Sequence, residues 1–438
     1  LKAMLRDPMT EALLSGQVMN GFQAYKPCVV YLNDQYWGLQ NIREKFDPMY
    51  FSTNYNVDPL SYNQLEYSFV SSNLVRLGIV HGDADSYRSI LTYMETHDLA
   101  VADNYAYVGS LMNMDSFIDF LIIEMYVANT SWRHNREFWQ PKGGKWEWLI
   151  PDLDRGYNMG NAEANILDEM HRGFPLFTGL LANREFRDRF IQRYAAHIYS
   201  TFDPERLVNI VDSLSANIEL EMPRHIERWQ AEDGIPSKSE WRISIEDIKQ
   251  FTSMRREYAL DNINAEFNLN GTAQLTVDIE QPGSGRILVN GTPMLSTFRI
   301  GRFFRNIPLT LTAVPEVGYQ FVEWEGLSNK ATVDLTLRRD QVLTAIFVHS
   351  TGNTIPADIT SNTRLTEANS PYSASENIVI SENTVLTVDE GVQINLVSGG
   401  SIYVHGQLIV NGAEDNPVIF QPNYNSGSER WGAICFVN

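Results

Sequence analysis

Hydrophobic periodicity changes once along the chain, close to residues 268–271 (NLNG). Before this point, apolar residues recur at three- and four-residue steps, which predicts packed helices over 115–127, 186–199 and 247–267. Beyond it, apolar and polar residues alternate, which is typical of strands. The order of these two patterns predicts an α+β head followed by all-β modules.

Two β-hairpins are expected within the head. The first joins the apolar runs 29–32 (VVYL) and 36–39 (YWGL) through the turn pair Asn33 and Asp34. The second joins residues 136–140 to 145–150 through the segment PKGG. Because these hairpins lie among helical segments, the head is predicted to mix both kinds of structure.

The part of the chain beyond the head divides into two modules. Residues 271–348 are predicted to form a small β module, and the Ser/Thr/Gly-rich stretch 349–353 is predicted to be a linker. Short glycine-punctuated strands follow within 354–438, which favours the beginning of a right-handed parallel β-helix, with a β-sandwich as the alternative. The strands are expected over 377–380, 385–388, 392–396, 401–404, 407–410, 418–420 and 431–436.

Length and charge limit the classes of function. With 438 residues the chain exceeds a single hydrophobic core, which predicts two to four domains. The changes in sequence pattern divide it into three, 1–268, 271–348 and 354–438. The 34 basic and 54 acidic side chains give a net charge of −20, which repels nucleic-acid phosphates and anionic membranes. We therefore expect no nucleic acid among the partners.

Other global features carry less information. No run of 18 apolar residues occurs, so no membrane span is predicted. Cys28 and Cys435 fall in different predicted domains and cannot form a disulfide framework. The first residues do not read as a signal peptide and the last ones read as a strand, so targeting signals and further β-helix rungs are expected outside this sequence.

The first candidate site combines residues 129–135 (NTSWRHN) with 146–154 (WEWLIPDLD). Asp152 and Asp154 follow an apolar strand two residues apart, so both carboxylates can point the same way. Two such charges repel unless a cation lies between them, and a hard divalent ion with oxygen ligands suits them. Asn135 offers a further oxygen. Alternatively, the carboxylates cap the next segment or pair with Arg155.

The second candidate is the stretch 36–47 (YWGLQNIREKFD). Strand alternation would place Arg43 on one face and Glu44 on the other. The plain interpretation is a salt bridge at the rim of the fold.

Taken in order, these motifs resemble the spore-coat-protein-H (CotH) kinase family. The resemblance spans nearly all of residues 1–265 and includes Arg6 and Asp7, the segment 186–190 (FRDRF) and the segment 223–229 (PRHIERW). It implies an atypical protein-kinase-like fold for the head. It also implies transfer of the ATP γ-phosphate to Ser/Thr of surface or secreted proteins, with ATP and a divalent metal (Mg or Mn) as cofactors.

The resemblance assigns roles to individual residues. Glu44, with Arg43 beside it, matches the family's strand near the nucleotide, and Asn135, Asp152 and Asp154 match its metal-binding residues. Ser131 departs from the family pattern, because relatives usually carry an aspartate there that would serve in catalysis. The basic glycine-rich segment that relatives carry before residues 6–7 is also absent from this sequence, so activity of this chain is in question.

The tail has resemblances of its own. Residues 283–291 (GSGRILVNG) and 318–324 (GYQFVEW) resemble an InlB B-repeat-like module, whose aromatic residues are expected in the core. Residues 377–438, including 431–434 (WGAI), resemble the opening rungs of secreted right-handed β-helix proteins. Both resemblances imply a secreted or cell-surface protein, with carbohydrate or the cell envelope as further candidate partners.

Two hypotheses follow. The first is a secreted CotH-like protein kinase in which Ser131, Asn135 and Asp152 are the candidate catalytic residues. The second is a non-catalytic surface or adhesion protein with a pseudokinase head and β modules for binding. The aspartate-to-serine departure favours the second, and the retained acidic pair and asparagine favour the first.

Overall fold

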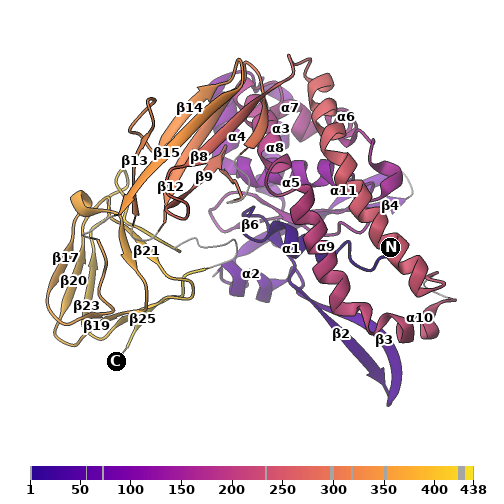
Figure 1. Ribbon diagram of the computed structural model, residues 1–438, viewed down its shortest axis with the longest axis horizontal. Helices are drawn as coiled ribbons and strands as arrows, with labels where there is room; N and C mark the ends of the chain where they lie inside the picture. Colours follow the sequence, from indigo (N-terminus) through magenta and orange to yellow (C-terminus); the bar gives the residue numbers. More distant parts are fainter. Residues whose placement is uncertain are drawn as a thin grey trace. The chain divides into compact units, whose positions relative to one another are not determined.

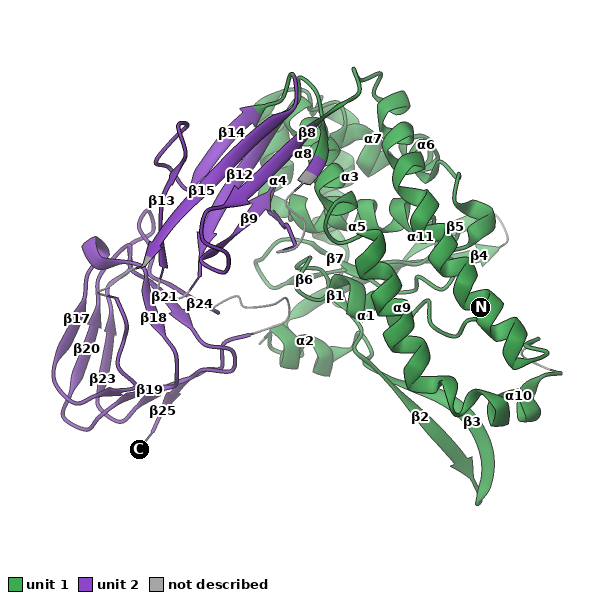
Figure 2. Ribbon diagram, in the orientation of Figure 1, with its two compact units in different colours: residues 1–273, 302–308, 336–338 green, residues 274–301, 309–335, 339–438 purple. Residues whose placement is uncertain are grey.

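The computed structural model describes residues 2–55, 57–71, 74–231, 234–295, 300–316, 319–349, 353–422 and 430–437. The chain divides into two compact units, which Figure 2 distinguishes by colour. Unit 1 comprises Leu1–Ala273, Arg302–Pro308 and Thr336–Arg338, and unit 2 comprises Gln274–Gly301, Leu309–Leu335 and Arg339–Asn438. Most of the predicted linker, residues 350–352, lies outside the described residues.

Unit 1 contains the helices labelled in Figure 1. They are α1 (Pro8–Leu14), α2 (Pro48–Tyr55), α3 (Asp85–Thr96), α4 (Ala102–Leu111), α5 (Met114–Tyr126), α6 (Ile166–Gly173), α7 (Pro175–Leu180), α8 (Arg184–Ile198), α9 (Pro204–Glu219), α10 (Met222–Trp229) and α11 (Lys238–Glu266), with a 3₁₀ turn at Met159–Asn161. Side-chain caps begin several of them, since Asn113 accepts from two amides at the start of α5 and Asn183 does so at α8. None of the described helices is long and apolar enough to cross a membrane.

Five strands of unit 1 form one sheet, and two form a separate ribbon. The strands are β1 (Gly21–Phe22), β2 (Tyr25–Leu32), β3 (Gln35–Arg43), β4 (Tyr62–Ser71), β5 (Leu74–His81), β6 (Arg136–Pro141) and β7 (Glu147–Ile150). The sheet has the order β1-β7-β6-β4-β5, and Figure 1 shows β2 and β3 as a ribbon that extends from the helices. Because β6 and β7 are antiparallel, the beginning of β6 lies beside the end of β7.

Helix α5 is the centre of unit 1, and nearly all of its side chains are buried. Asp119, on this helix, is fully buried and accepts hydrogen bonds from Arg193 (2.5 Å) and His197 (3.0 Å) of α8. Burial alone would raise the pKa of Asp119, but Arg193 and His197 outweigh it and lower the pKa to about 2. Helices α5 and α8 are therefore joined by an ionic network as well as by apolar packing.

The next part of the chain forms two four-stranded sheets. Its strands are β8 (Thr272–Ile279), β9 (Gly285–Val289), β10 (Thr292–Pro293), β11 (Ile300–Phe304), β12 (Pro308–Pro315), β13 (Tyr319–Trp324), β14 (Thr332–Thr336) and β15 (Gln341–His349). The sheet orders are β10-β9-β12-β14 and β11-β8-β15-β13. Trp324 is fully buried, and Phe321 lies between Trp324 and Phe347 with ring centroids 5.8 and 5.6 Å away. These aromatic residues therefore pack with one another.

The last part of the chain is a stack of short parallel strands. They are β16 (Asp358–Ile359), β17 (Thr363–Leu365), β18 (Tyr372–Ala374), β19 (Ile378–Ile380), β20 (Val385–Val388), β21 (Gln393–Leu396), β22 (Ile402–Val404), β23 (Gln407–Val410), β24 (Ile419–Pro422) and β25 (Ile434–Phe436), with a 3₁₀ turn at Glu367–Asn369. They form three sheets, β16-β19-β22-β25, β17-β20-β23 and β18-β21-β24.

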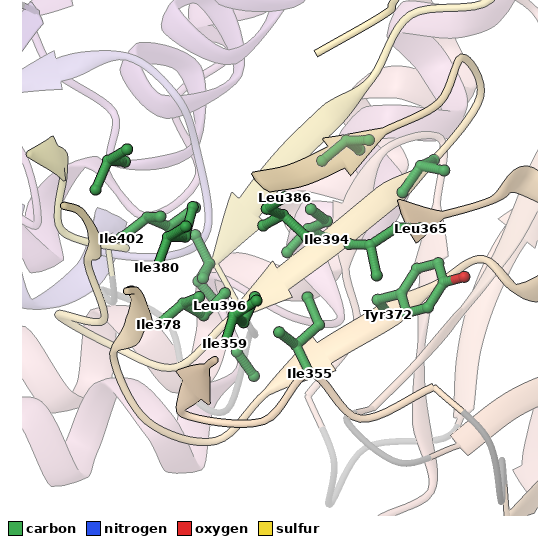
Figure 3. Packing of buried hydrophobic residues seen from close by; sticks show 14 residues of the cluster. Ile355, Ile359, Leu365, Tyr372, Ile378, Ile380, Leu386, Ile394, Leu396 and Ile402 are labelled. Atoms are coloured by element: carbon green, nitrogen blue, oxygen red, sulfur yellow. The ribbon is translucent and has the colours of Figure 1, made fainter. Parts of the chain in front are cut away.

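Each described pairing in these three sheets is parallel, so successive turns of the chain stack on one another. Figure 3 shows the side chains that fill the interior, among them Ile378, Leu386 and Ile394, all fully buried. The stacked parallel strands agree with the sequence prediction. That these strands begin a right-handed β-helix stays a prediction.

Candidate functional site

The antiparallel pairing of β6 and β7 brings the two halves of the predicted site together. Asn135 directly precedes β6, and Asp152 follows β7 by two residues. The amide Nδ2 of Asn135 donates to Oδ2 of Asp152 (3.0 Å) and to the hydroxyl of Ser131 (3.3 Å). Ser131, Asn135 and Asp152 therefore form one hydrogen-bonded group at a single edge of the sheet.

Asn129, in the loop between α5 and β6, holds this group from the other side. Its Oδ1 accepts from the hydroxyl (2.8 Å) and the backbone amide (3.1 Å) of Ser131. Its Nδ2 donates to the backbone carbonyl of Asp152 (3.0 Å). Asn129 is fully buried, so these bonds fix the loop against the segment that follows β7.

Asp152 and Asp154 lie close together, as the sequence predicted for a pair on one side. The backbone amide of Asp154 donates to Oδ1 of Asp152 (3.1 Å). Burial, and next the charge of Asp152, raise the pKa of Asp154. Arg155 approaches Asp154 only to 3.9 Å, with both side chains partly exposed. Arg6 also lies beside this pair, since its Nη1 donates to the backbone carbonyl of Asp154 (3.3 Å) and the charge of Asp154 raises the pKa of Arg6 against the effect of burial.

Arg43 reaches this segment through Asp7. Its Nη1 lies 2.5 Å from Oδ2 of Asp7, while Oδ1 of Asp7 accepts from the backbone amide of Leu153 (3.3 Å). Burial raises the pKa of Asp7, Arg43 lowers it, and Asp152 raises it further. Arg43 and Asp7 therefore form a salt bridge, which was the plain interpretation of this stretch. Through Asp7 the salt bridge is linked to the backbone amide of Leu153, which lies between the two aspartates in the sequence.

Glu44 is placed differently from the other candidates. Its Oε2 accepts from the backbone amide of Ala24 (2.9 Å), and its Oε1 accepts from Asn54 (3.3 Å). Among the described residues, no hydrogen bond or ion pair joins Glu44 to Asn135, Asp152 or Asp154. Its side chain instead ties the beginning of β2 to α2.

Sequence reasoning missed two residues around the site, Asn129, which holds the loop in place, and Glu124, a buried carboxyl group. Glu124 lies near the end of α5 and is fully buried. Burial raises its pKa to about 8, the amide of Asn129 lowers it, and the charge of Asp152 raises it. Neither of its carboxylate oxygens makes a well-formed hydrogen bond with the described residues. The available signal was a carboxylate within the apolar run 120–126 (FLIIEMY).

The donor set fits a hard divalent cation. Asp152 and Asp154 supply carboxylate oxygens, and Oδ1 of Asn135 is left over after its Nδ2 donates to Asp152. Mg²⁺ and Mn²⁺ prefer such oxygen ligands and commonly complete their shell with water and substrate phosphate. Within the described ranges, no group of three or more His, Cys, Asp or Glu side chains could hold a metal ion. The candidate protein ligands here are two carboxylates and one amide.

Comparison with known families identifies the family of this part of the chain. The family model of the CotH kinase protein matches residues 2–259, well over half of the chain. The chain belongs to the CotH kinase family. The match covers Arg43, Glu44, Ser131, Asn135 and both aspartates.

A second family model, the divergent InlB B-repeat domain, matches residues 306–351, which overlap the second half of the predicted β module, 271–348, and the beginning of the predicted linker. No curated protein matches the chain. The family assignments therefore rest on these two family models.

Proposed function

We propose that this CotH-family chain is an atypical protein kinase. It transfers the γ-phosphate of ATP to Ser/Thr side chains of a secreted or cell-surface protein, using a divalent metal, Mg or Mn. The observation that carries the proposal is the amide of Asn135, which bonds to both Asp152 and Ser131 within a segment that matches the family model. A phosphoryl-transfer site of this kind needs its metal-binding residues beside the position of the acceptor.

The residues of the chain divide the work between them. Asp152, Asp154 and Asn135 hold the ion, which when bound offsets the charge of the phosphates. Asn129 fixes the main chain of Asp152, and Asp7 fixes that of Leu153, so the two carboxylates are oriented before a ligand arrives. Arg43 is the last residue of β3 and Glu44 follows it, and we assign this end of the strand to the nucleotide side.

Ser131 limits the rate in this proposal. Its hydroxyl donates to Asn129 and cannot accept a substrate proton at neutral pH as a carboxylate would. Transfer is therefore slow but possible, because phosphoryl transfer depends mainly on positioning and electrostatics.

The second candidate is a non-catalytic surface or adhesion protein with a pseudokinase head. The specific observation that favours it is the same hydroxyl, which completes a closed set of hydrogen bonds and leaves no proton acceptor at position 131. Under this proposal the β modules bind the cell envelope or carbohydrate. In either case we place the protein outside the cell and take residues 354–438 as the beginning of a right-handed β-helix.

The test measures nucleotide binding and transfer separately. Calorimetry with ATP and Mg²⁺ or Mn²⁺ reports binding, and labelled ATP with a Ser/Thr peptide library reports transfer. We expect Asp154→Ala to abolish metal-dependent nucleotide binding, whereas Asp103→Ala, at an exposed acid of α4, leaves it intact. Binding without transfer supports the pseudokinase. No binding by the unaltered protein rejects a nucleotide function altogether.

A further inference from the structure

Unit 1 contains a cavity of about 730 Å³ that shares no residue with the candidate kinase site. It lies among α6, α7, the first half of α8, the end of α11 and the segment 302–308. Its charged side chains are His171, Arg184, Arg187, Asp188, Glu266 and Arg305.

Positive charge exceeds negative charge in this cavity. Asp188 lies 3.3 Å from Arg184 and 3.7 Å from Arg187, so one carboxylate serves two guanidinium groups. Glu266 is engaged by His171 (2.5 Å). Three arginines thus face two carboxylates in a chain whose net charge is −20. A local reversal of sign in a concave site concentrates anions.

Arg305 supplies the unbalanced charge. Its side chain is exposed and has no hydrogen bond or ion pair with the described residues. The charges of Arg184 and Arg187 are shared with Asp188, whereas that of Arg305 is fully available to a ligand.

The backbone that carries Arg305 is held firmly. Gln192 of α8 is fully buried, and its Nε2 donates to the carbonyls of Phe304 and Ile307, both at 2.9 Å. Its Oε1 accepts from the amide of Phe304 (3.0 Å). The amide of Arg305 itself donates to the carbonyl of Gly271 (3.0 Å). A side chain on so fixed a segment binds with little loss of conformational entropy from the backbone.

We propose that this cavity binds a phosphate group. Guanidinium groups match the planar faces and paired oxygens of phosphate, and charge-assisted bonds of this kind are about twice as strong as neutral ones. Free inorganic phosphate and a phosphorylated Ser/Thr side chain of a polypeptide present the same chemistry. The site is independent of the kinase activity proposed above, because none of its residues takes part in it.

The experiment titrates the full chain with inorganic phosphate, with a phosphoserine peptide and with the same peptide unphosphorylated, at constant ionic strength. We expect Arg305→Gln to weaken phosphate binding about tenfold, which corresponds to the loss of one charged hydrogen bond. The matched control is Arg302→Gln, at an exposed arginine three residues earlier on the same segment, outside the cavity. It should bind as the unaltered protein does.

Asp188→Asn should change the strength of phosphate binding in the opposite direction. It removes the carboxylate that Arg184 and Arg187 share, so phosphate binding should become about fivefold tighter. Tighter binding of the phosphopeptide than of free phosphate identifies a protein-borne group, and equal binding identifies the free ion. The proposal is overturned if no phosphate binds at millimolar concentration, if both arginine variants weaken binding equally, or if Asp188→Asn weakens it.

Discussion

At the scale of single residues, Ser131 determines what the candidate kinase site can do. Its hydroxyl donates to Asn129 and accepts from Asn135, so it is a structural member of the site rather than a proton acceptor. A carboxylate at this position would still accept from Asn135 and would add the missing base.

We therefore predict that Ser131→Asp raises the rate of phosphoryl transfer. General-base catalysis contributes about a hundred- to ten-thousand-fold, and a gain toward the lower end is expected because Asn129 has to turn its amide toward the new carboxylate. Transfer from labelled ATP measures the change. Ser131→Ala is the control, since it also removes the hydroxyl but adds no base. An equal gain in both variants would show that loss of the hydroxyl, not a new base, is responsible.

Glu124 gives a prediction about stability and pH. Its pKa is raised from the ordinary value of 4.5 to about 8, chiefly by burial. The folded state therefore holds a proton that the unfolded state releases, so this contribution is complete below about pH 4.5 and is lost as the pH rises toward 8. Since each pKa unit corresponds to about 1.4 kcal/mol, the loss reaches a few kcal/mol.

Urea unfolding at pH 5 and pH 8 tests this expectation. Glu124→Gln stays neutral, so its free energy of unfolding should rise relative to the unaltered protein between the two pH values. Glu95→Gln, at an exposed position of α3, should change in parallel with the unaltered protein. A Glu124→Gln difference that is the same at both pH values would contradict the buried, protonated carboxylate.

At the scale of elements, hydrophobic periodicity predicted helices and strands better than it predicted which of them contact one another. The helices expected over 115–127 and 186–199 correspond to α5 and α8, and the seven short strands expected after residue 377 correspond to β19–β25 within one to three residues at each end. These elements bury a regular stripe or face, which the sequence displays directly. The strands β16–β18, which lie before residue 377, were not predicted.

Contacts between distant segments could not be read from the pattern. Asp7 was recognised only as part of a motif, yet it connects Arg43 to Leu153, which lies 146 residues away in the chain. Gln192 appeared as one polar residue in a helix, and nothing local indicates that its amide binds residues more than 110 positions later. Such roles depend on tertiary placement and not on local preference.

Gln192 also provides the prediction at this scale. Gln192→Met keeps the size of the side chain but leaves the carbonyls of Phe304 and Ile307 and the amide of Phe304 without their partner. Each buried group left unsatisfied costs about 1–3 kcal/mol, so the segment 302–308 should open more readily. Amide hydrogen exchange of residues 303–307 should accelerate. Gln250→Met, at an exposed position of α11, should leave that exchange unchanged.

At the scale of the whole molecule, each compact unit consists of several separate segments of the chain. Unit 1 takes in residues 302–308 and 336–338, which belong to the range predicted as a separate β module. Phe304 and Leu337 of these segments are fully buried. The head therefore completes its packing with parts of the chain that follow its last helix.

This arrangement predicts that a fragment ending at residue 268 is less stable than one ending at residue 349. The shorter fragment lacks the two segments, so it loses the burial of Phe304 and Leu337 and leaves Gln192 without its backbone partners. Burying each large apolar side chain contributes roughly 1.5–3 kcal/mol, and 1 kcal/mol shifts the melting temperature by about 2–4 °C at this size. We expect the shorter fragment to melt roughly 5 °C or more below the longer one. Gln192→Met supplies the internal control, because it should destabilise the longer fragment and have almost no effect on the shorter one. Equal effects of Gln192→Met in both fragments would mean that the segments 302–308 and 336–338 do not stabilise the head.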